Sequence, residues 1–317
     1  MTQNKYTNKQ SNNRRSGANG WLTRLVLLTL MLIGIIILAF IYLPSLVNPG
    51  GNHSQSNNKS NRQGQDQSQK EYRSLENSIL DKSLIPQGDE GQVIHHKYYS
   101  LSYNEETEQS NWVVYRLTKA SLDAKNVPRA KRFKEDKAVS TRSAAHSDYS
   151  HSGYTRGHLA PAGDMAFSSD AMKECFYMSN MSPQMRVCNN GIWKELEETT
   201  REWALIRDEL IIATGPIFDN GKDQTIGKNK VVVPSHFYKI IIDEDTKKNI
   251  SFIIPNALSN KHLNKYITSI NEIERKLNLD FFNGFLSEEQ ESQTFASGWA
   301  FDERKYNQRV NSWNKEK

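Results

Sequence analysis

The chain has 317 residues, of which 37% are hydrophobic and 24% charged, and its formal net charge is +5 at pH 7. Residues 1–70 carry eight basic side chains and one acidic side chain, so the remainder, with 33 basic and 35 acidic residues, has a net charge of about −2. The positive total is therefore no evidence for a nucleic-acid-binding surface, and any basic groove must be local. Cys175 and Cys188 are too few for a disulfide framework. One disulfide or two separate thiols remain open, and a zinc site is disfavoured.

The N-terminal 72 residues predict a membrane anchor and a tether in place of a folded core. Leu25 to Leu43 is a run of 19 uncharged, mostly apolar residues, which is long enough to cross a bilayer as a helix. The segment after it is rich in Asn, Ser, Gln and Gly and too poor in apolar residues to fold. We predict a cytoplasmic basic tail at 1–24, a transmembrane signal anchor at 25–43, a flexible polar linker at 44–72 and a globular domain at 73–317.

The flanks of the apolar run predict its orientation. Five basic residues and no acidic residue precede it, which favours a single-pass protein of the cytoplasmic membrane with its N-terminus in the cytoplasm and its globular domain periplasmic or extracellular. A cleaved signal peptide is the alternative, but the segment before the run is long and residues 42–48 offer no small-x-small cleavage site. A buried core helix is disfavoured because the run is apolar all round.

Short segments rich in β-branched and aromatic residues recur through the globular part and predict strands. They are residues 96–103, 112–117, 176–179, 209–214, 231–233, 237–243 and 250–254. Helical periodicity is clearest in Gly191–Leu210 and Leu263–Leu277, where apolar residues recur at intervals of three and four. Because strands and helices do not alternate, the pattern indicates an α+β fold with an antiparallel sheet. The polar stretch Arg304–Lys317 is expected to fray.

One eleven-residue segment, Thr155 to Met165, is the most informative for function. Its sequence is Thr-Arg-Gly-His-Leu-Ala-Pro-Ala-Gly-Asp-Met, so Arg156 and His158 stand two positions apart around a glycine, just before a loop with Pro and Gly. This arrangement suits a strand end that faces an anionic substrate. An arginine that grips phosphate and a histidine that accepts a proton are two parts of a phosphodiesterase site, and a metal ligand is expected downstream.

Several ordered motifs together resemble a known family. Besides residues 155–165, they are Tyr-Met-Ser-Asn-Met-Ser-Pro-Gln at 177–184 and the stretch Asn189–Arg201, with weaker matches at 112–118, 213–217 and 252–256. They resemble the DNA/RNA non-specific endonucleases of the ββα-metal superfamily, which includes secreted bacterial nucleases and mitochondrial endonuclease G. The resemblance covers Tyr98 to Phe301, and it implies a central antiparallel sheet with a ββα-metal active-site motif in a nuclease domain at 73–317. Thr155 stands where the family usually has Asp.

The resemblance implies roles for five residues. His158 is expected to be the general base, because a neutral imidazole accepts a proton at low cost near physiological pH. Arg156 and Arg201 are expected to contact phosphate, and Glu197 to hold a metal-bound water. Asn189 is expected to be the metal ligand, since a single neutral oxygen suits Mg²⁺, which keeps most of its waters. Mn²⁺ in its place is also compatible with this ligand.

Each of these assignments has a structural alternative. A lone His158 could serve only to cap or hydrogen-bond a loop. Asn189 or its neighbour Asn190 could cap the helix that follows. Glu197 and Arg201 could form a solvent-exposed i,i+4 pair worth a few tenths of a kcal/mol. The match of each position to the motif favours the functional interpretation.

Other polar residues near the motif are expected to be structural. Asn180 and Gln184 should support the strand-to-helix turn. His146 and His151 lie in a Ser-rich loop, and their spacing fits no common metal-ligand pattern, so a surface loop is expected there.

The sequence therefore predicts a membrane-tethered, metal-dependent endonuclease that hydrolyses phosphodiester bonds of DNA and RNA without sequence preference. Its expected partners are DNA and RNA as substrates, and the lipid bilayer through residues 25–43. One alternative is a catalytically weak, membrane-tethered nucleic-acid-binding or uptake module of the same fold, which has lost rate through Thr155. A second is a membrane scaffold whose outer domain binds protein, which predicts no salt-sensitive affinity for DNA.

Overall fold

The computed structural model describes residues 82–219, 223–294 and 298–313. All of them fall within the second of two compact units, Gln65–Lys317. The predicted tail, membrane span and linker at 1–24, 25–43 and 44–72 lie outside the described residues, so these assignments stay predictions. Among the residues that are described, no helix is both long and apolar enough to cross a membrane.

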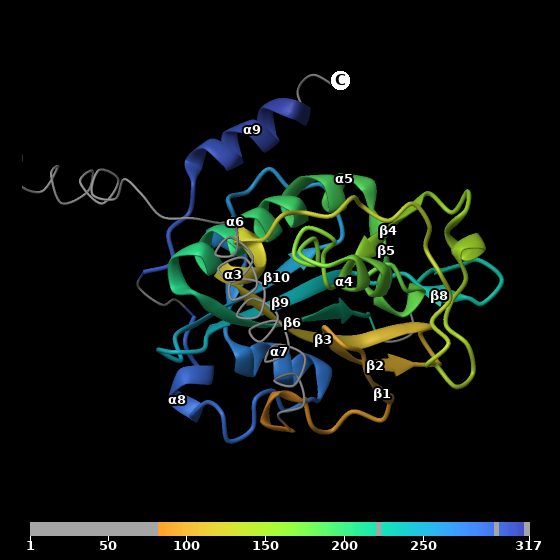
Figure 1. The fold of residues 1–317 in the computed structure, drawn as a ribbon, viewed down its shortest axis with the longest axis horizontal. Coiled ribbons are helices and arrows are strands. Elements are labelled where there is room, and N and C mark those ends of the chain that lie inside the picture. The colour runs from red at the N-terminus through yellow and green to blue at the C-terminus, as the bar shows by residue number, and fades with distance from the viewer. Residues whose placement is uncertain (1–81, 220–222, 295–297, 314–317) are drawn as a thin grey trace, which may run out of the picture. The chain divides into compact units, whose positions relative to one another are not determined.

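A seven-stranded antiparallel sheet forms the centre of the fold, in the order β1-β2-β3-β6-β9-β10-β11 (Figure 1). The strands are β1 (Gln92–His95), β2 (Ser100–Asn104), β3 (Gln109–Thr118), β6 (Glu209–Ile217), β9 (His236–Asp243), β10 (Asn249–Pro255) and β11 (Ile267–Thr268). The central strands β3, β6 and β9 are buried along almost their whole length. Such near-continuous burial requires cover on both faces of the sheet.

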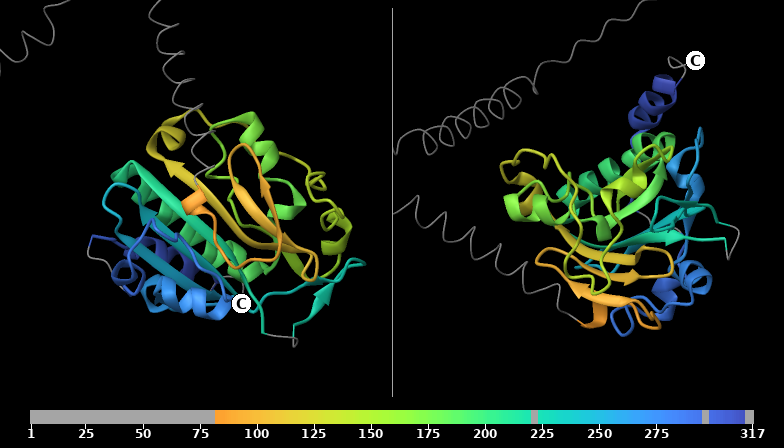
Figure 2. Two further views of the ribbon diagram at one scale, coloured as in Figure 1. Left: turned by 90° about the horizontal axis from the view of Figure 1, so that it is seen from below. Right: turned by 90° about the vertical axis from the view of Figure 1, so that its right-hand side faces the viewer.

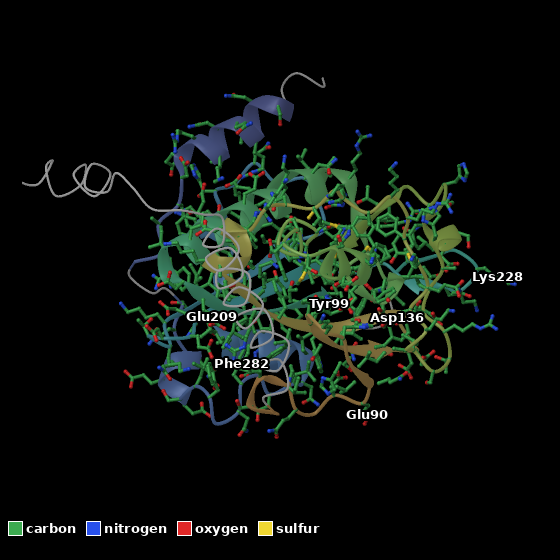
Figure 3. The ribbon with its side chains drawn as sticks, viewed as in Figure 1. Glu90, Tyr99, Asp136, Glu209, Lys228 and Phe282 are labelled. Carbon is green, nitrogen blue, oxygen red and sulfur yellow. The ribbon has the colours of Figure 1, made fainter. Side chains whose placement is uncertain are left out.

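Helices cover both faces of this sheet (Figures 1 and 2). Alternate residues of β9 divide between two apolar clusters: Phe237 and Ile241 belong to one, and Tyr238 and Ile240 to the other. This division follows from the two-residue period of a strand. The first cluster packs beneath α6 (Lys194–Arg207), and the second packs against α7 (Ile270–Leu277). The fully buried rings of Tyr99 and Phe282 belong to these two clusters, whereas Glu90 and Lys228 are exposed at the periphery (Figure 3).

A smaller unit of two strands and a helix lies on the α6 side of the sheet. Strand β4 (Tyr154–His158) pairs antiparallel with β5 (Met181–Met185). The chain then continues through the short helix α5 (Arg186–Cys188) and the π-helical turn η5 (Asn189–Trp193) into α6. These two paired strands and the helix form a ββα unit that carries all five predicted site residues.

The remaining elements are short connections and edge structures. They are η2 (Lys82–Leu84), α3 (Lys119–Asp123), η3 (His146–Tyr149), α4 (Ser169–Glu174), η4 (Met178–Asn180), the hairpin β7 (Thr225–Ile226) and β8 (Val231–Val232), η6 (Leu263–Tyr266), α8 (Glu288–Glu291) and α9 (Glu303–Trp313).

The predicted α+β class with a central antiparallel sheet is confirmed, and so are the strands at 112–117, 209–214, 231–233, 237–243 and 250–254. The strand predicted at 176–179 is wrong. Tyr177 precedes the 3-10 turn η4 and forms only an isolated parallel bridge with Lys134, while the neighbouring Phe176 ring is buried against Phe133 and His158. The strand predicted at 96–103 starts only at Ser100, because the His96 amide bonds the Tyr99 carbonyl and closes a turn first.

The helix boundaries also differ from those predicted. The helix predicted from Gly191 to Leu210 is regular only over α6, because Gly191 has non-helical angles (φ −106°, ψ −112°) and the chain turns out of the helix at Asp208. The helix predicted over 263–277 begins at Ile270, since Ser269 caps it through the Glu272 amide and the residues before it join the sheet edge.

The expectation that residues 304–317 fray is wrong for the part that is described. Residues 303–313 form α9, and its residue Arg309 is buried. The Arg309 guanidinium forms an ion pair with Glu195 on α6 and donates to the carbonyls of Ser259 and Lys261. These bonds hold α9 against α6 and the loop at 259–261, so the polar sequence of this helix does not mean that it frays.

Candidate active site

The pairing of β4 with β5 sets the positions of the first two predicted site residues. Arg156 lies opposite Pro183 and His158 opposite Met181 in the antiparallel register. Between them, Gly157 approaches the partner strand so closely that a Cβ there would lie 2.3 Å from the Gln184 side-chain oxygen and 2.8 Å from its Cβ. A glycine is therefore required at the centre of the motif for the two strands to pack.

The His158 imidazole lies in an aromatic pocket at the end of β4. Its ring packs edge-on against Phe176, with the centroids 4.8 Å apart, and tilted against Phe133 at 5.7 Å. The residue is 9% exposed, and within the described structure its Nε2 has no hydrogen-bond partner. Burial lowers the pKa of His158 from 6.5 to about 3, and the positive charge of Arg129 adds to this effect. The free protein therefore presents a neutral imidazole at physiological pH.

The Arg156 guanidinium lies beside this pocket and is held by the segment that precedes β4. Its Nη2 donates to the His146 carbonyl at 2.9 Å and lies 3.3 Å from His146 Nε2. The guanidinium also lies 5.5 Å from the ring centroids of Phe133 and Tyr149. His146 and His151 are exposed, as predicted for a surface loop, but His146 contributes to the wall of the site by orienting Arg156. No group of three or more His, Cys, Asp or Glu side chains in the described ranges is arranged to hold a metal.

A pair of hydrogen bonds fixes the orientation of the Asn189 amide. Thr155 Oγ1 donates to the Gln184 carbonyl at 2.8 Å, so its lone pair is available to accept the bond from Asn189 Nδ2 at 2.9 Å. The amide nitrogen is thereby directed to Thr155, which leaves Asn189 Oδ1 as the atom able to act as a ligand. The break at Gly191 follows directly, so Asn189 is positioned by the turn at the start of the helix. Asn189 does not act as an N-cap: the N-cap positions of η5 and α6 are Cys188 and Trp193, and neither segment has a side-chain cap bond.

Glu197 and Arg201 do not form the solvent-exposed pair that was the alternative interpretation. Arg201 Nη1 bonds Asp164 Oδ1 at 2.8 Å, and Asp164 Oδ2 accepts the Tyr115 hydroxyl at 2.7 Å. The Asp164 side chain is 1% exposed, and a Cβ at Gly163 would lie 2.7 Å from Arg201 Nη1. The signature loop and α6 are thus joined by a partly buried ion pair, and Arg201 is held against the loop.

The Glu197 carboxyl is partly buried in the same region. Burial raises its pKa above the usual range, the negative charge of Asp164 raises it further, and the positive charges of Lys239 and Arg201 oppose the rise. The pKa of Glu197 therefore depends on the positive charges of Lys239 and Arg201. A carboxyl of this kind can exchange a proton or hold a water near neutral pH.

Sequence reasoning missed three residues of this cluster: Tyr115, Asp164 and Lys239. Asp164 was within the quoted signature, but its role as partner of Arg201 required a contact across 37 positions. Lys239 could have been noticed, because it is a single charge in the apolar strand Phe-Tyr-Lys-Ile-Ile-Ile. The wall formed by Phe133 and Phe176 could not have been found from spacing, since the two rings come from separate loops.

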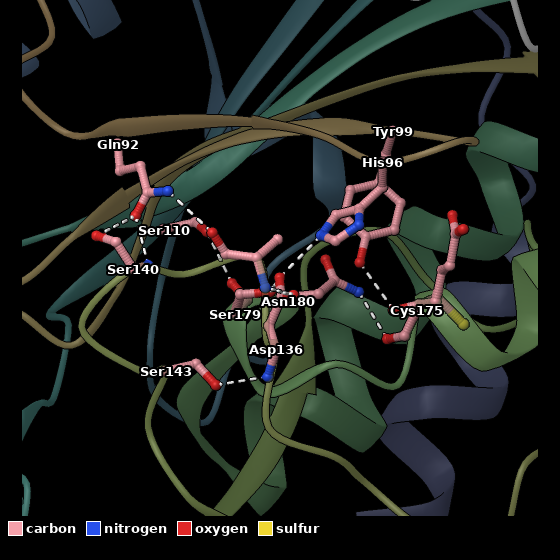
Figure 4. A network of polar contacts seen from close by, with 12 residues as sticks. Gln92, His96, Tyr99, Ser110, Asp136, Ser140, Ser143, Cys175, Ser179 and Asn180 are labelled. Atoms are coloured by element: carbon pink, nitrogen blue, oxygen red, sulfur yellow. Dashed lines mark hydrogen bonds and ion pairs between the residues drawn. The ribbon is translucent and has the colours of Figure 1, made fainter.

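A network of polar contacts surrounds Ser179 and Asn180, which directly precede β5 (Figure 4). Asn180 Oδ1 accepts from the Ala160 amide at 2.9 Å, and Nδ2 donates to the carbonyls of Ala160 and Cys175. The neighbouring Ser179 hydroxyl donates to Asp136 at 2.6 Å, and His96 bonds the same carboxylate. Asn180 is therefore structural, but it holds the loop after β4 and the end of α4 and not the strand-to-helix turn predicted for it.

The two cysteines are separate, buried thiols. Burial raises the pKa of both Cys175 and Cys188 to about 12, so neither is a thiolate near neutral pH. Gln184 Nε2 lies 3.7 Å from Cys188 Sγ. Gln184 therefore links the hairpin to α5, which agrees with the supporting role predicted for it.

The site has three groups of residues on one ββα unit. A neutral imidazole and an arginine lie along β4, an oriented amide lies at the start of the helix, and a carboxyl with a second arginine lies on α6. An antiparallel sheet that carries such a unit defines the class of ββα nucleases. A family model for the DNA/RNA non-specific endonucleases matches residues 76–288, and the chain belongs to this family.

Relatives of known name agree with this assignment. Nuclease EXOG, mitochondrial, from Danio rerio is 35% identical over 199 residues, which cover 57% of this chain and 58% of the relative. Endonuclease G, mitochondrial, from Homo sapiens is 34% identical over 204 residues, which cover 60% and 69% of the two chains. A solved structure of the EndoG/EndoGI complex has a TM-score of 0.58 and 32% identity, covering 64% of this chain and 89% of that chain. The match thus spans little more than half of the Danio rerio relative.

Proposed function

We propose that this chain is a metal-dependent endonuclease that hydrolyses phosphodiester bonds in DNA and RNA without sequence preference. The observation that carries the proposal is the bond between Asn189 and Thr155, which leaves the Asn189 side-chain oxygen able to bind a metal on the unit that also holds a neutral His158. Membership of the endonuclease family and the names of the relatives support it.

The donor set fits a hard divalent cation. Asn189 Oδ1 is a single neutral oxygen, and Mg²⁺ is commonly bound by one or two protein oxygens with several waters retained. We propose Mg²⁺ as the cofactor, with Mn²⁺ able to replace it. When bound, the ion would stabilise charge on the phosphate and on the leaving oxygen.

The side chains around this position have complementary roles in the proposed reaction. His158 accepts the proton of the attacking water, because its imidazole is neutral. Arg156 and Arg201 bind phosphate oxygens, and the bonds to His146 and Asp164 hold their guanidinium groups in place. Glu197 orients a water at the metal position. None of these groups reads a base, which is why cleavage without sequence preference is expected.

The low pKa of His158 is compatible with a general base once substrate is bound. A phosphodiester placed between Arg156 and the imidazole brings a negative charge close to the ring. That charge favours the protonated form, so the pKa of His158 should rise in the substrate complex. The aromatic pocket of Phe133 and Phe176 keeps the base neutral until then.

We also propose that residues 25–43 anchor the nuclease in the cytoplasmic membrane, with residues 1–24 in the cytoplasm and the nuclease domain outside it. The support is the length of the apolar run and the basic residues before it. A non-specific nuclease with this orientation could not reach the cell's own chromosome.

The test is a digestion assay with the full-length chain in detergent, given plasmid DNA or RNA. We expect both substrates to be degraded with Mg²⁺ or Mn²⁺, and degradation to stop when EDTA is added. Asn189→Ala should raise the Mg²⁺ concentration required, because the residue supplies metal affinity. Salt-sensitive DNA binding without any cleavage would instead support the weak binding module.

A further inference from the structure

Lys239 places a positive charge in the floor of the site. It lies on β9 between β6 and β10, opposite Thr214 and Phe252, and is only 1% exposed. By the alternation of the strand, it shares the face of Phe237 and Ile241, which pack in the cluster beneath α6. Removing an ammonium group from water is unfavourable unless opposite charges compensate it. A lysine at this place therefore needs a nearby partner.

The aromatic contacts of Lys239 locate its ammonium group. Nζ lies 5.0 Å from the centroid of the Trp193 ring and 6.0 Å from that of Tyr115. Trp193 is one helical turn before Glu197, so the two residues lie on the same face of the helix. The Lys239 ammonium group therefore lies beneath the first turn of α6, the turn that contains Glu197.

The other charges leave Glu197 as the partner of Lys239. Asp164 is the second carboxylate of the cluster, but its two oxygens already bond Arg201 and the Tyr115 hydroxyl. Arg201, the other cation, is correspondingly held by Asp164. Asp164 and Arg201 thus form the ion pair at the signature loop, and the charges of Glu197 and Lys239 attract each other between the helix and the sheet.

We propose that Lys239 is a positioning residue that acts through Glu197: its ammonium group keeps the Glu197 carboxylate ionised and fixed in the site. This proposal rests on the nuclease function proposed above and deepens it. The electrostatics agree, because Glu197 is the largest favourable influence on the charge of Lys239, and Lys239 is the largest on that of Glu197. Burial shifts the pKa of both groups towards the neutral form, and each charge opposes that shift in the other.

The first measurement follows Glu197 directly in metal-free protein. Full-length chain in EDTA is titrated while the Glu carboxyl carbons are observed by ¹³C NMR, and Glu197→Gln assigns the signal. Lys239→Met replaces the ammonium by an uncharged chain of similar length. We expect the pKa of Glu197 to be higher in Lys239→Met than in wild type. The other groups that face Glu197 are unchanged in both proteins: Asp164, Arg201, Tyr115, Cys188 and Glu198.

The second measurement is a double-mutant cycle on kcat and KM for plasmid DNA at saturating Mg²⁺. Lys239→Met should lower kcat about 10–100-fold, as loss of a supporting partner commonly does, and move the acidic limb of the pH–rate profile upward. In the Glu197→Gln background the same change should have no further effect on kcat. The Glu197→Gln, Lys239→Met protein has no buried charge left unpaired, so the comparison remains possible if Lys239→Met alone is unstable. Lys248→Met removes an exposed lysine on the next turn and is the matched control.

Two results would overturn the proposal. One is an unchanged pKa of Glu197 in Lys239→Met. The other is an equal fall in kcat when Lys239→Met is introduced into wild type and into Glu197→Gln, because that result indicates a structural role. A wild type without nuclease activity would refute the proposed function. The NMR titration would still decide whether Lys239 lowers the pKa of Glu197.

Discussion

At the residue scale, the site depends on side chains held in an unusual state by their neighbours. The His158 imidazole is kept neutral by two phenylalanine rings and a nearby arginine. The Asn189 amide is turned by a hydroxyl that can both donate and accept. Each arrangement has a measurable consequence that a purely structural histidine or asparagine would not have.

Burial of His158 should make the protein less stable in acid. The unfolded chain binds a proton as the pH falls below 6.5, whereas folded His158 does so only near its pKa of about 3. Stability present above pH 6.5 is therefore lost as the pH falls towards 3, by up to about 1.4 kcal/mol per pH unit. His158→Leu should reduce this slope in urea titrations between pH 7 and 5. Exposed His151→Asn is the control, and equal slopes for His158→Leu and wild type would show that the imidazole is not protected.

Thr155 should determine how tightly the site holds its metal. Thr155→Val keeps the shape but removes the bonds to Asn189 and Gln184, so the amide loses its fixed orientation. The Mg²⁺ concentration for half-maximal plasmid cleavage should then rise about 10–100-fold. Thr155→Ser preserves both bonds and should titrate like wild type. If Thr155→Val has the wild-type metal requirement, the hydroxyl does not position the ligand.

At the scale of elements, the strands of the sheet could largely be predicted and the helix ends could not. The apolar runs of β6, β9 and β10 leave little choice but a buried strand. The segment at 176–179 is also rich in aromatic residues, yet its Phe176 ring is buried against Phe133 and His158. An apolar composition indicates that a segment is buried, but it does not indicate whether a neighbouring strand or another side chain buries it. The strand at 176–179 was predicted wrongly for this reason.

The residues of the candidate site could likewise be predicted only in part from the sequence. Arg156 and His158 were predicted because they lie together in one distinctive motif, and Asn189 because it begins a second motif further along the chain. Lys239 and Tyr115 come from distant strands, and only the pairing of β3, β6 and β9 brings them beneath α6. Residues such as Lys239 and Tyr115 thus come close to the site through strand pairing, which cannot be read from a single sequence.

The C-terminal helix should contribute to the stability of the whole molecule. Arg309 is 6% exposed, forms an ion pair with buried Glu195 and donates to the Lys261 carbonyl at 2.7 Å. Arg309→Met leaves the Glu195 charge buried and unpaired, so the free energy of unfolding should fall by about 3–5 kcal/mol. Adding Glu195→Gln should recover part of this loss, as measured by urea unfolding. Wild-type stability in Arg309→Met would mean that α9 is not held by this pair.

The proposed anchor makes a prediction about the orientation of the full chain. Protease added to intact spheroplasts should remove everything beyond the linker at 44–72 and leave the basic tail protected, because positive flanks remain in the cytoplasm. Protection of the nuclease domain would reverse the orientation. A mature N-terminus located after Pro44 would show a cleaved signal peptide instead.

The most direct test of the account is the rate at which full-length wild type and His158→Ala nick supercoiled plasmid at saturating Mg²⁺. We predict metal-dependent nicking by wild type and a rate lower by about 10²–10⁴ for His158→Ala, with DNA affinity little changed, since a general base commonly contributes that factor. Near wild-type turnover by His158→Ala, or a wild type that binds DNA and does not nick it, would contradict the account.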